Sequence, residues 1–336
     1  MTKSVRLGLE ANLRQFILLV VVNGFVGAMV GLERTILPLL AEQAYGLTSH
    51  SAALSFIVTF GLAKAVTNFL AGRLSDRIGR RPTLIIGWLF AIPVPLMVMW
   101  APTWSWILAA NVLLGINQGL AWSTTVIMKI DLVGPARRGF AMGLNEAAGY
   151  LAVALAALAS GFIAEAYGLR PEPFYLGIAF SAIGLALSVA FVRETRGHAR
   201  EEARALHEGP PVADRSSIQN NPSGRDIFLD TSWRNPALFS ASQAGLVNNL
   251  NDGLAWGIFP LLFASQGLDL GQIGTLAFVY PATWGLCQLW TGGLSDRVGR
   301  KPLIASGMIL QAAALAAVAS LSGFGPWLGA SLCLGL

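Results

Sequence analysis

The sequence predicts an all-α integral membrane protein, on the evidence of its composition and the length of its apolar stretches. Of the 336 residues, 54% are hydrophobic and 12% are charged, whereas soluble domains carry about 25% charged residues. The mean hydropathy is +0.59. The apolar residues come in stretches of about 20, the length of a helix that crosses a bilayer. A cytoplasmic enzyme, a nucleic-acid-binding protein and a disordered chain are therefore disfavoured.

Ten apolar stretches are interpreted as membrane spans. The first follows a basic N-terminus but exceeds the roughly 7–15 apolar residues of a signal peptide, so we interpret it as an uncleaved span. Because the bilayer core holds no water, each span must satisfy its own backbone hydrogen bonds, and long stretches without alternation are helices rather than barrel strands. The spans cover residues 16–40, 51–71, 83–101, 105–130, 140–164, 174–192, 236–263, 271–291 and 303–321, and the tenth starts near Pro326.

The positions of the positive charges predict the orientation of these helices. Lys and Arg concentrate in alternate connections, and the opposite set of connections holds only Arg170. By the positive-inside rule, the N-terminus is cytoplasmic in a multi-pass protein of the cell (inner) membrane. The formal net charge of +5 is then a topology signal and requires no nucleic-acid partner. The predicted cytoplasmic connections are 72–82, 134–139, 193–235 and 292–302.

A polar segment and an internal repeat divide the chain into two helical groups. Residues 193–235 are rich in Arg, Glu, Pro, Ser and Asn, which is typical of a mobile or surface-lying linker. This linker separates a six-helix group, residues 1–192, from a second group, residues 236–336. AGRLSDRIGRRP (71–82) and TGGLSDRVGRKP (291–302) match at eight of twelve positions at an offset of 220, as in parallel repeats. At that offset we expect the second bundle to be incomplete, with about nine or ten of twelve helices present.

Both copies of this motif resemble the cytoplasmic signature of the major facilitator superfamily, Gly-x-Leu-x-Asp-Arg-x-Gly-Arg-Arg/Lys. Two shorter patterns extend the resemblance: an acidic residue, six others and Arg-Gly from Asp131 to Gly139, and Arg193-Glu194-Thr195 after the sixth span. The resemblance implies two six-helix bundles related as parallel repeats, forming a monomeric transporter that moves a small solute by alternating access. The implied gating residues are Gly72, Asp76, Arg77, Gly79, Arg80, Arg81, Asp131, Arg138, Glu194, Asp296, Arg297, Gly299 and Arg300.

The same resemblance implies specific contacts among these gating residues. Asp76 and Asp296 would hold the outward-open state by charge pairing between the halves. Gly72 and Gly79 suit a tight turn, because glycine permits close approach or a positive φ. The alternative is a basic turn that only sets the topology. A cytoplasmic ion-pair network is also implied, formed by Asp131, Arg138 and Glu194 with Arg80 or Arg81.

Two departures disfavour a typical drug/proton antiporter. Such members of the superfamily carry Arg-x-x-Gln-Gly in the fourth span, whereas Gly115 occupies the Arg position here, ahead of Gln118 and Gly119. Their Gly-Pro-x-x-Gly-Gly signature is absent from the fifth span.

Charged residues inside the spans are candidates for function, because a charge at mid-bilayer costs roughly 2.5–3.5 kcal/mol on insertion scales. Glu33, Glu146, Asp252 and Lys64 are candidates for coupling to protons, and a Lys64–Glu146 pair is geometrically possible. Arg34 is a candidate for substrate contact. The alternatives are that Arg34 extends towards the outer interface and that Glu146 belongs to a structural ion pair.

Polar stripes on two spans predict the walls of a central cavity. In the fourth span, Asn111, Gln118 and Trp122 recur at helical spacing, and the seventh span is rich in asparagine. Hydrogen bonding between helices is the alternative. The predicted cavity residues are Arg34, Asn111, Gln118, Trp122, Asn248, Asn251, Asp252 and Trp256.

No enzyme site is evident in the sequence. It contains no HExxH or GxSxG motif and no phosphate-binding glycine loop, so we expect no catalytic residues, metal or cofactor. The predicted function is secondary active transport of a small solute by alternating access, with proton coupling through a buried carboxylate as one option. The alternative is a membrane receptor or sensor that keeps the same fold without moving solute.

Overall fold

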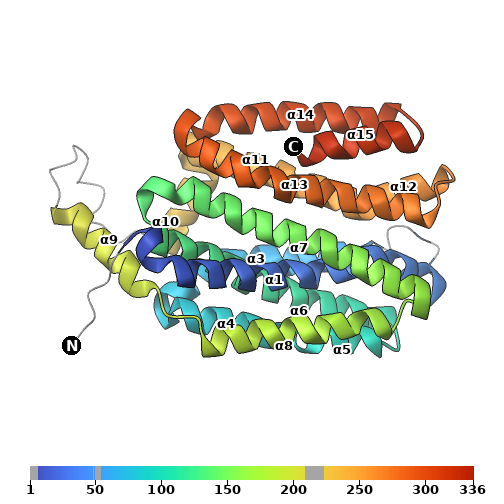
Figure 1. Cartoon of the computed structure of the whole chain (residues 1–336), viewed down its shortest axis with the longest axis horizontal. Coiled ribbons are helices and arrows are strands. Elements are labelled where there is room, and N and C mark those ends of the chain that lie inside the picture. The colour runs from blue at the N-terminus through green and yellow to red at the C-terminus, as the bar shows by residue number, and fades with distance from the viewer. Residues whose placement is uncertain (1–6, 48, 50–53, 209–222) are drawn as a thin grey trace.

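The computed structural model describes residues 7–47, 49, 54–208 and 223–336, and this part of the chain is a bundle of long helices lying side by side (Figure 1). The first half contains α1 (Leu9–Gln43), α3 (Ser55–Ile78), α4 (Arg80–Ala91), α5 (Pro93–Met99), α6 (Trp104–Val133), α7 (Arg138–Tyr167) and α8 (Tyr175–Ala190). The helices α9 (Arg196–Glu208) and α10 (Gly224–Leu229) follow. The second half contains α11 (Pro236–Gly253), α12 (Phe259–Ser265), α13 (Leu270–Val298), α14 (Arg300–Ser320) and α15 (Phe324–Gly335).

The first half is built around one apolar core, to which α1 and α3 to α8 contribute. Small residues allow its helices to cross closely. A side chain at Gly27 of α1 would overlap the backbone of Gly149 on α7, and one at Gly31 would overlap the carbonyl of Val153. Tight contact of this kind replaces the hydrophobic effect as the force between helices in a membrane.

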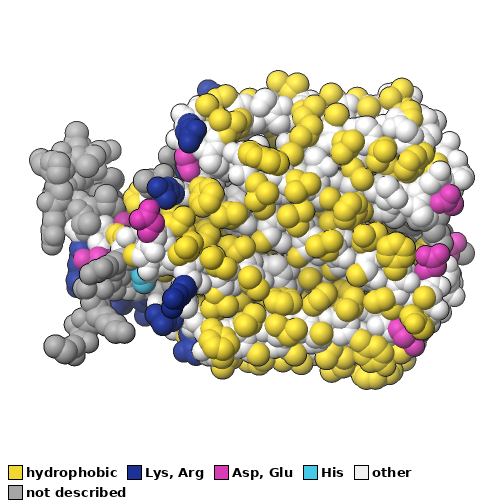
Figure 2. All heavy atoms as spheres, viewed as in Figure 1, with side chains coloured by type: hydrophobic (Ala, Val, Ile, Leu, Met, Phe, Trp, Pro, Cys, Tyr) yellow, Lys and Arg dark blue, Asp and Glu magenta, His cyan; other side chains and the backbone are white. Residues whose placement is uncertain are grey.

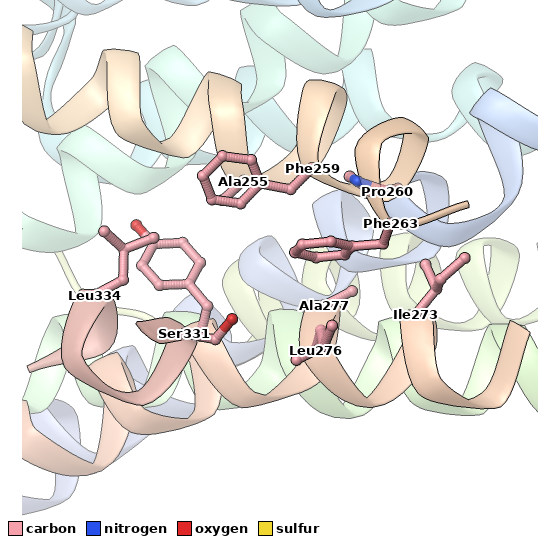
Figure 3. A pocket seen from close by; sticks show the side chains of 10 residues that line it. Ala255, Phe259, Pro260, Phe263, Ile273, Leu276, Ala277, Ser331 and Leu334 are labelled. Carbon is pink, nitrogen blue, oxygen red and sulfur yellow. The ribbon is translucent and has the colours of Figure 1, made fainter. Parts of the chain in front are cut away.

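The second half has its own smaller apolar core, formed by the residues that follow α11, from Leu254 through α12 to α15. Between α11 and α12 lies a π-helical segment, Leu254–Ile258. A single widened turn of this type is found mostly at functional sites. Figure 3 shows the apolar pocket beside it, where Phe259 and Phe263 face Leu276 of α13. Its volume of about 10 Å³ is close to the least that can hold one water molecule.

The internal repeat is visible in the helix packing. Gly115 of α6 lies against the backbone of α3 at Phe60 and Lys64. Gly335 of α15 lies against the backbone of α13 at Tyr280 and Trp284 in the same way. All three positions are related by the offset of 220 found in the sequence, so the two halves share a local packing motif.

The two halves meet mainly where α7 lies against α13. Gly139 and Gly143 of α7 pack against Gly292 of α13, so closely that a side chain on any of them would overlap the opposite backbone. Further along, Gly285 of α13 packs against Leu151 of α7. This crossing brings together residues that are about 140 positions apart in sequence.

In the described part of the chain, all ten predicted spans are helical, but their ends differ from the prediction. Residues 51–53 of the second predicted span lie outside the described part. Helices α3 and α13 continue to Ile78 and Val298, so most of the motif residues predicted in connections 72–82 and 292–302 lie on helices. A helix can extend past the bilayer with charged residues because water solvates them there. The actual turns shrink to Gly79 (φ 112°) and Gly299 (φ 87°), a backbone conformation that favours glycine. Gly72 does not make the expected close approach, because open space surrounds its Cα.

The described part of the segment 193–235, predicted as a mobile or surface-lying linker, contains helices. Arg196–Glu208 forms α9, Gly224–Leu229 forms α10, and Asp230–Arg234 is a π-helical turn. Alternating arginine and glutamate side chains support α9, with Arg204 and Glu201 3.7 Å apart. Residues 209–222 lie outside the described part of the chain.

Six segments are long and apolar enough to cross a membrane, among the residues described. On the face shown in Figure 2, apolar side chains cover the middle of the molecule, the visible Lys and Arg gather at the end near α9, and Asp and Glu lie at both ends. The six segments are Leu9–Gln43, Ser55–Ile78, Arg80–Met99, Arg138–Tyr167, Glu172–Ala190 and Arg300–Ser320.

Candidate functional site

A cavity of about 230 Å³ lies between the two halves of the molecule. The first half contributes ten lining residues and the second half four. The residues from the first half are Val30, Phe60, Lys64, Asn68, Gln118, Trp122, Ser123, Glu146, Tyr150 and Val153. Those from the second half are Asn248, Asn249, Trp256 and Trp284.

Aromatic rings form much of the cavity wall. Tyr150 of α7 stacks on Trp284 of α13 with ring centroids 4.7 Å apart. Trp122 meets Tyr150 edge-on at 6.0 Å, and Trp256 lies 6.4 Å from the same ring. Stacked and edge-on pairs of this kind add to the stability gained by burial. Tyr150 therefore links the aromatic residues of both halves.

Two charged side chains, Lys64 of α3 and Glu146 of α7, line the cavity. Glu146 accepts hydrogen bonds from the Nδ2 of Asn145 (2.8 Å) and the Nε1 of Trp122 (3.3 Å). The ammonium group of Lys64 lies 5.7 Å from the ring centroid of Phe60 and 5.8 Å from that of Trp122. The expected Lys64–Glu146 ion pair is not formed, although the two charges share one cavity.

Asp252 connects the halves from a buried position next to the cavity. Its Oδ2 accepts a hydrogen bond from Tyr150 of α7 at 3.0 Å, and its Oδ1 accepts one from Tyr280 of α13 at 2.5 Å. The side chain of Asn251 donates to the Tyr280 hydroxyl at 3.4 Å. Asp252 is 6% exposed, so the two tyrosines provide much of the polar environment of its carboxylate.

Arg34 and Glu33 lie buried in α1, close to the cavity but not on its surface. The Arg34 guanidinium stacks on the ring of Trp256, 4.4 Å from the ring centroid, and lies 5.0 Å from that of Phe60. It does not extend towards the outer interface, because it is 8% exposed. Neither carboxylate oxygen of Glu33 has a donor within hydrogen-bond distance. Asn111 and Arg34 are the neighbouring polar groups that interact with Glu33.

The predicted cavity residues thus divide into two layers. Gln118, Trp122, Asn248 and Trp256 line the cavity. A second, buried layer behind them contains Arg34, Asn111, Asn251 and Asp252.

Sequence reasoning did not select several residues that line the cavity. For Tyr150, the sequence offers only one indication, its position four residues after Glu146 on the same predicted helix. Trp284 carried a clearer signal, because the repeat offset of 220 makes it the counterpart of Lys64. Phe60 and Tyr280 are related by the same offset. Comparison of the two copies of the repeat would therefore have indicated α13 as a source of residues at the site.

The repeated motif of the first half forms a compact network at the start of α4. Arg80 pairs with Asp76 at 2.5 Å and with Asp131 at 3.2 Å. Asp131 also accepts a hydrogen bond from the Thr195 hydroxyl at 2.8 Å. The expected pairing of Asp131 with Arg80 is therefore present. Arg138 lies outside this network, because it pairs with Glu202 of α9 at 2.5 Å.

Glu194 binds the backbone at the start of α4 rather than a guanidinium. Its carboxylate accepts hydrogen bonds from the N–H groups of Arg80 (3.0 Å) and Arg81 (3.1 Å). Burial raises the pKa of the Glu194 carboxyl, but backbone hydrogen bonds from Arg196, Arg80, Arg81 and Thr195 lower it by more, so that the pKa lies below its usual value. An anion at a helix N-terminus also interacts favourably with the helix dipole.

Asp296 is the motif residue that joins the two halves. Its carboxylate accepts hydrogen bonds from the N–H groups of Gly139 and Phe140, both at 3.0 Å. These donors are the free N–H groups at the start of α7, so the contact is a helix cap and not the expected pair of charged side chains. Asp76 does not link the halves, since its recorded ion pair is with Arg80 of the same half.

The helices and the cavity define a class of protein before any comparison is made. Long apolar helices in two repeated halves surround a central polar and aromatic cavity, as in a multi-pass membrane protein that handles a small molecule. The chain belongs to the Major Facilitator Superfamily, whose family model matches residues 16–335. Members of that superfamily are transporters, and the predicted fold class is confirmed.

Curated relatives and a solved structure support this assignment. The multidrug resistance protein MdtG of Citrobacter koseri is 28% identical over 294 residues, which cover 84% of this chain and 67% of the relative. MdtG of Salmonella typhimurium is 27% identical over the same length. The human organic anion transporter MFSD10 (TETRAN) has the same fold, with a TM-score of 0.60 and 17% identity over 96% of this chain and 84% of that one.

Proposed function

We propose that the chain is a secondary active transporter that carries a small organic solute through the cavity between its halves by alternating access. One observation supports this most strongly: the cavity has walls from both halves. A rocking movement of one half against the other would therefore change both the shape of the cavity and the side to which it opens. The proposed domains are residues 1–192 and 236–336, joined by a cytoplasmic linker, residues 193–235, and working as a monomer.

The proposed inner gate lies at the crossing of α7 and α13. Asp296 caps α7 there, and the glycine contacts close the space between the two helices. The start of α7 and the end of α13 lie at the same end of the molecule as α9 (Figure 1), which is the basic end in Figure 2. By the positive-inside rule we place that end and the N-terminus in the cytoplasm, with the protein in the plasma membrane.

Asp252 is the proposed site of proton coupling. Its carboxylate accepts hydrogen bonds from Tyr150 in one half and Tyr280 in the other. A proton on this carboxylate would remove its charge and weaken both bonds, which would loosen the contact between the halves. Glu146 and Glu33 are the alternative coupling sites, and Lys64 is the cation that interacts with Asp252 and Glu146.

The names of the relatives favour drug-like organic solutes. Both MdtG relatives are called multidrug resistance proteins, and the aromatic wall of the cavity suits compounds with a ring. The two missing antiporter signatures in the fourth and fifth spans therefore do not exclude a multidrug-type substrate range for this chain.

Transport in proteoliposomes tests the proposed function. We expect the purified chain to exchange a radiolabelled aromatic solute, chosen by a binding screen, and to accumulate it when a pH gradient is imposed. Asp252→Asn should keep the exchange and lose the gradient-driven accumulation. Asp269→Asn is the matched control, because Asp269 only caps α13 and asparagine is an equally good cap. Exchange no faster than in protein-free liposomes would contradict transport, and gradient-driven accumulation by Asp252→Asn would contradict coupling at Asp252.

A further inference from the structure

The ammonium group of Lys64 is a charged group of the cavity without a hydrogen-bond partner. Within the described residues it makes no hydrogen bond and no ion pair. The rings of Phe60 and Trp122 lie beside it, and the carboxylates of Asp252 and Glu146 interact with it at longer range. The side chain is partly exposed to the cavity that it lines. An ammonium group has three donors, and a buried charge without partners is costly. An anion entering the cavity would supply the missing acceptor.

Three of the four carboxylate oxygens near Lys64 already accept hydrogen bonds. Asn145 and Trp122 both donate to Oε1 of Glu146, and the two tyrosines donate to the two oxygens of Asp252. A cationic solute would have to compete with these donors at all of the nearby carboxylate oxygens except Oε2 of Glu146. An anionic solute meets no such competition at Lys64, so the hydrogen bonding of the cavity favours a negative charge.

The size and walls of the cavity limit the rest of the solute. The volume of about 230 Å³ is below the roughly 300–1,000 Å³ of pockets for drug-sized ligands. The rings of Trp122, Trp256 and Trp284 offer surfaces for stacking. One aromatic ring with a small charged substituent fits both the volume and the walls.

We infer that the cavity binds small aromatic anions, with Lys64 as the residue that holds the anionic group. This inference rests on the proposed transport function, since it names the substrate class of the same cavity. The ring of the solute lies among the tryptophans, and its carboxylate or similar group contacts the Lys64 ammonium. Asn248 and Asn249 of the second half line the same cavity and supply polar groups beside the bound anion.

Calorimetric titration of the purified chain with three probes of equal size tests the charge preference. The probes are benzoate, neutral benzamide and cationic benzylamine. Because a hydrogen bond to a charged group contributes about 1.5–3 kcal/mol, we expect benzoate to bind about tenfold or more tightly than either other probe. Equal or tighter binding of benzylamine, or no binding of benzoate at millimolar concentration, would overturn the inference.

Two substitutions test the role of Lys64 itself. Lys64→Met keeps much of the side-chain volume and should abolish the preference for benzoate, whereas Lys64→Arg should retain it. A preference for benzoate that survives in Lys64→Met would overturn the assignment. The comparison of the three probes on the unchanged chain stays decisive if Lys64→Met does not fold. If benzoate binds but the protein transports no solute, the transport function is contradicted and the anion site stands. If the protein transports a cation but does not bind benzoate, the anion site is contradicted and the transport function stands.

Discussion

Two aspartates at equivalent positions of the repeat have different partners, which shows how context decides the role of a residue. The side chain of Asp76 is 68% exposed and pairs with Arg80 of its own half. The side chain of Asp296 is 19% exposed and caps α7 of the other half. The sequence motif predicts the aspartate in both copies. It does not predict the partner, because a partner depends on which helix begins opposite the motif.

Gly27 is predicted to be intolerant of a larger side chain. A Cβ atom there would overlap the carbonyl of Gly149, so Gly27→Val should force α1 and α7 apart. Overpacking of this kind costs typically about 1–3 kcal/mol. Thermal unfolding of the purified protein should show a lowered midpoint. Gly61→Val in α3 is the matched control, because open space surrounds Gly61, and an equal loss of stability in both variants would contradict the close crossing.

Glu194 is predicted to make stability depend on pH. Its pKa in the folded chain lies below the ordinary value of 4.5, so the carboxylate stabilises the fold above that value. The stabilisation is lost as pH falls through the folded pKa. Glu194→Gln should therefore lower the unfolding midpoint at pH 7. A lost helix cap costs about 0.5–2 kcal/mol, and we expect the low end because the side chain is exposed.

The difference between Glu194→Gln and the unchanged protein should shrink as pH falls below 4.5. Thermal scans at several pH values between 7 and 3 measure it. A difference that stays constant over this range would show that Glu194 does not act through its charge.

At the scale of helices, the start of α7 carries the contact that distinguishes the two copies of the motif. Free N–H groups at a helix start need acceptors, and α7 finds its acceptor in the opposite half. The start of α4 finds its acceptor in Glu194, at the start of the linker that directly follows the first half. The two caps are chemically alike, but only the cap on α7 can break when the halves separate.

Removal of the Asp296 cap is predicted to open the cytoplasmic side. Spin labels at Ile78 and Val298, equivalent positions at the ends of α3 and α13, would report the separation of the halves after Cys287 and Cys333 are replaced by serine. Asp296→Ala should shift the distance distribution to longer values, because a lost cap costs about 0.5–2 kcal/mol. Asp76→Ala is the matched control and should change the distribution little. Identical distributions for both variants would contradict a gate at α7.

At the scale of the whole molecule, the sequence predicts the membrane helices and the repeat but not the contacts between the halves. Apolar length identifies the helices of the predicted spans, and six of the described segments are long and apolar enough to cross a membrane. The repeat also survives in the packing of Gly115 and Gly335. Helix ends were less predictable, because charged sequence can remain helical in water.

The candidate site was predictable only in part. Buried charges and polar stripes identified the α1, α6 and α11 residues, since polar groups are rare and costly in a membrane. The division into a lining layer and a buried layer depends on the rotation of each helix and on the π-helical turn after Asp252. Neither leaves a clear pattern in one sequence. The aromatic wall formed by Tyr150 and Trp284 requires knowing that α7 lies against α13.

Side-specific labelling of a cysteine in the cavity tests alternating access most directly. In a background without Cys287 and Cys333, Asn248→Cys places a thiol at the cavity wall. Its reaction with a membrane-impermeant maleimide is measured in right-side-out and inside-out vesicles. Alternating access predicts reaction from both faces, with a solute that binds the cavity protecting the thiol in each case. Alternating access would be contradicted if the thiol reacted from one face only under all conditions, with and without solute and with and without a pH gradient.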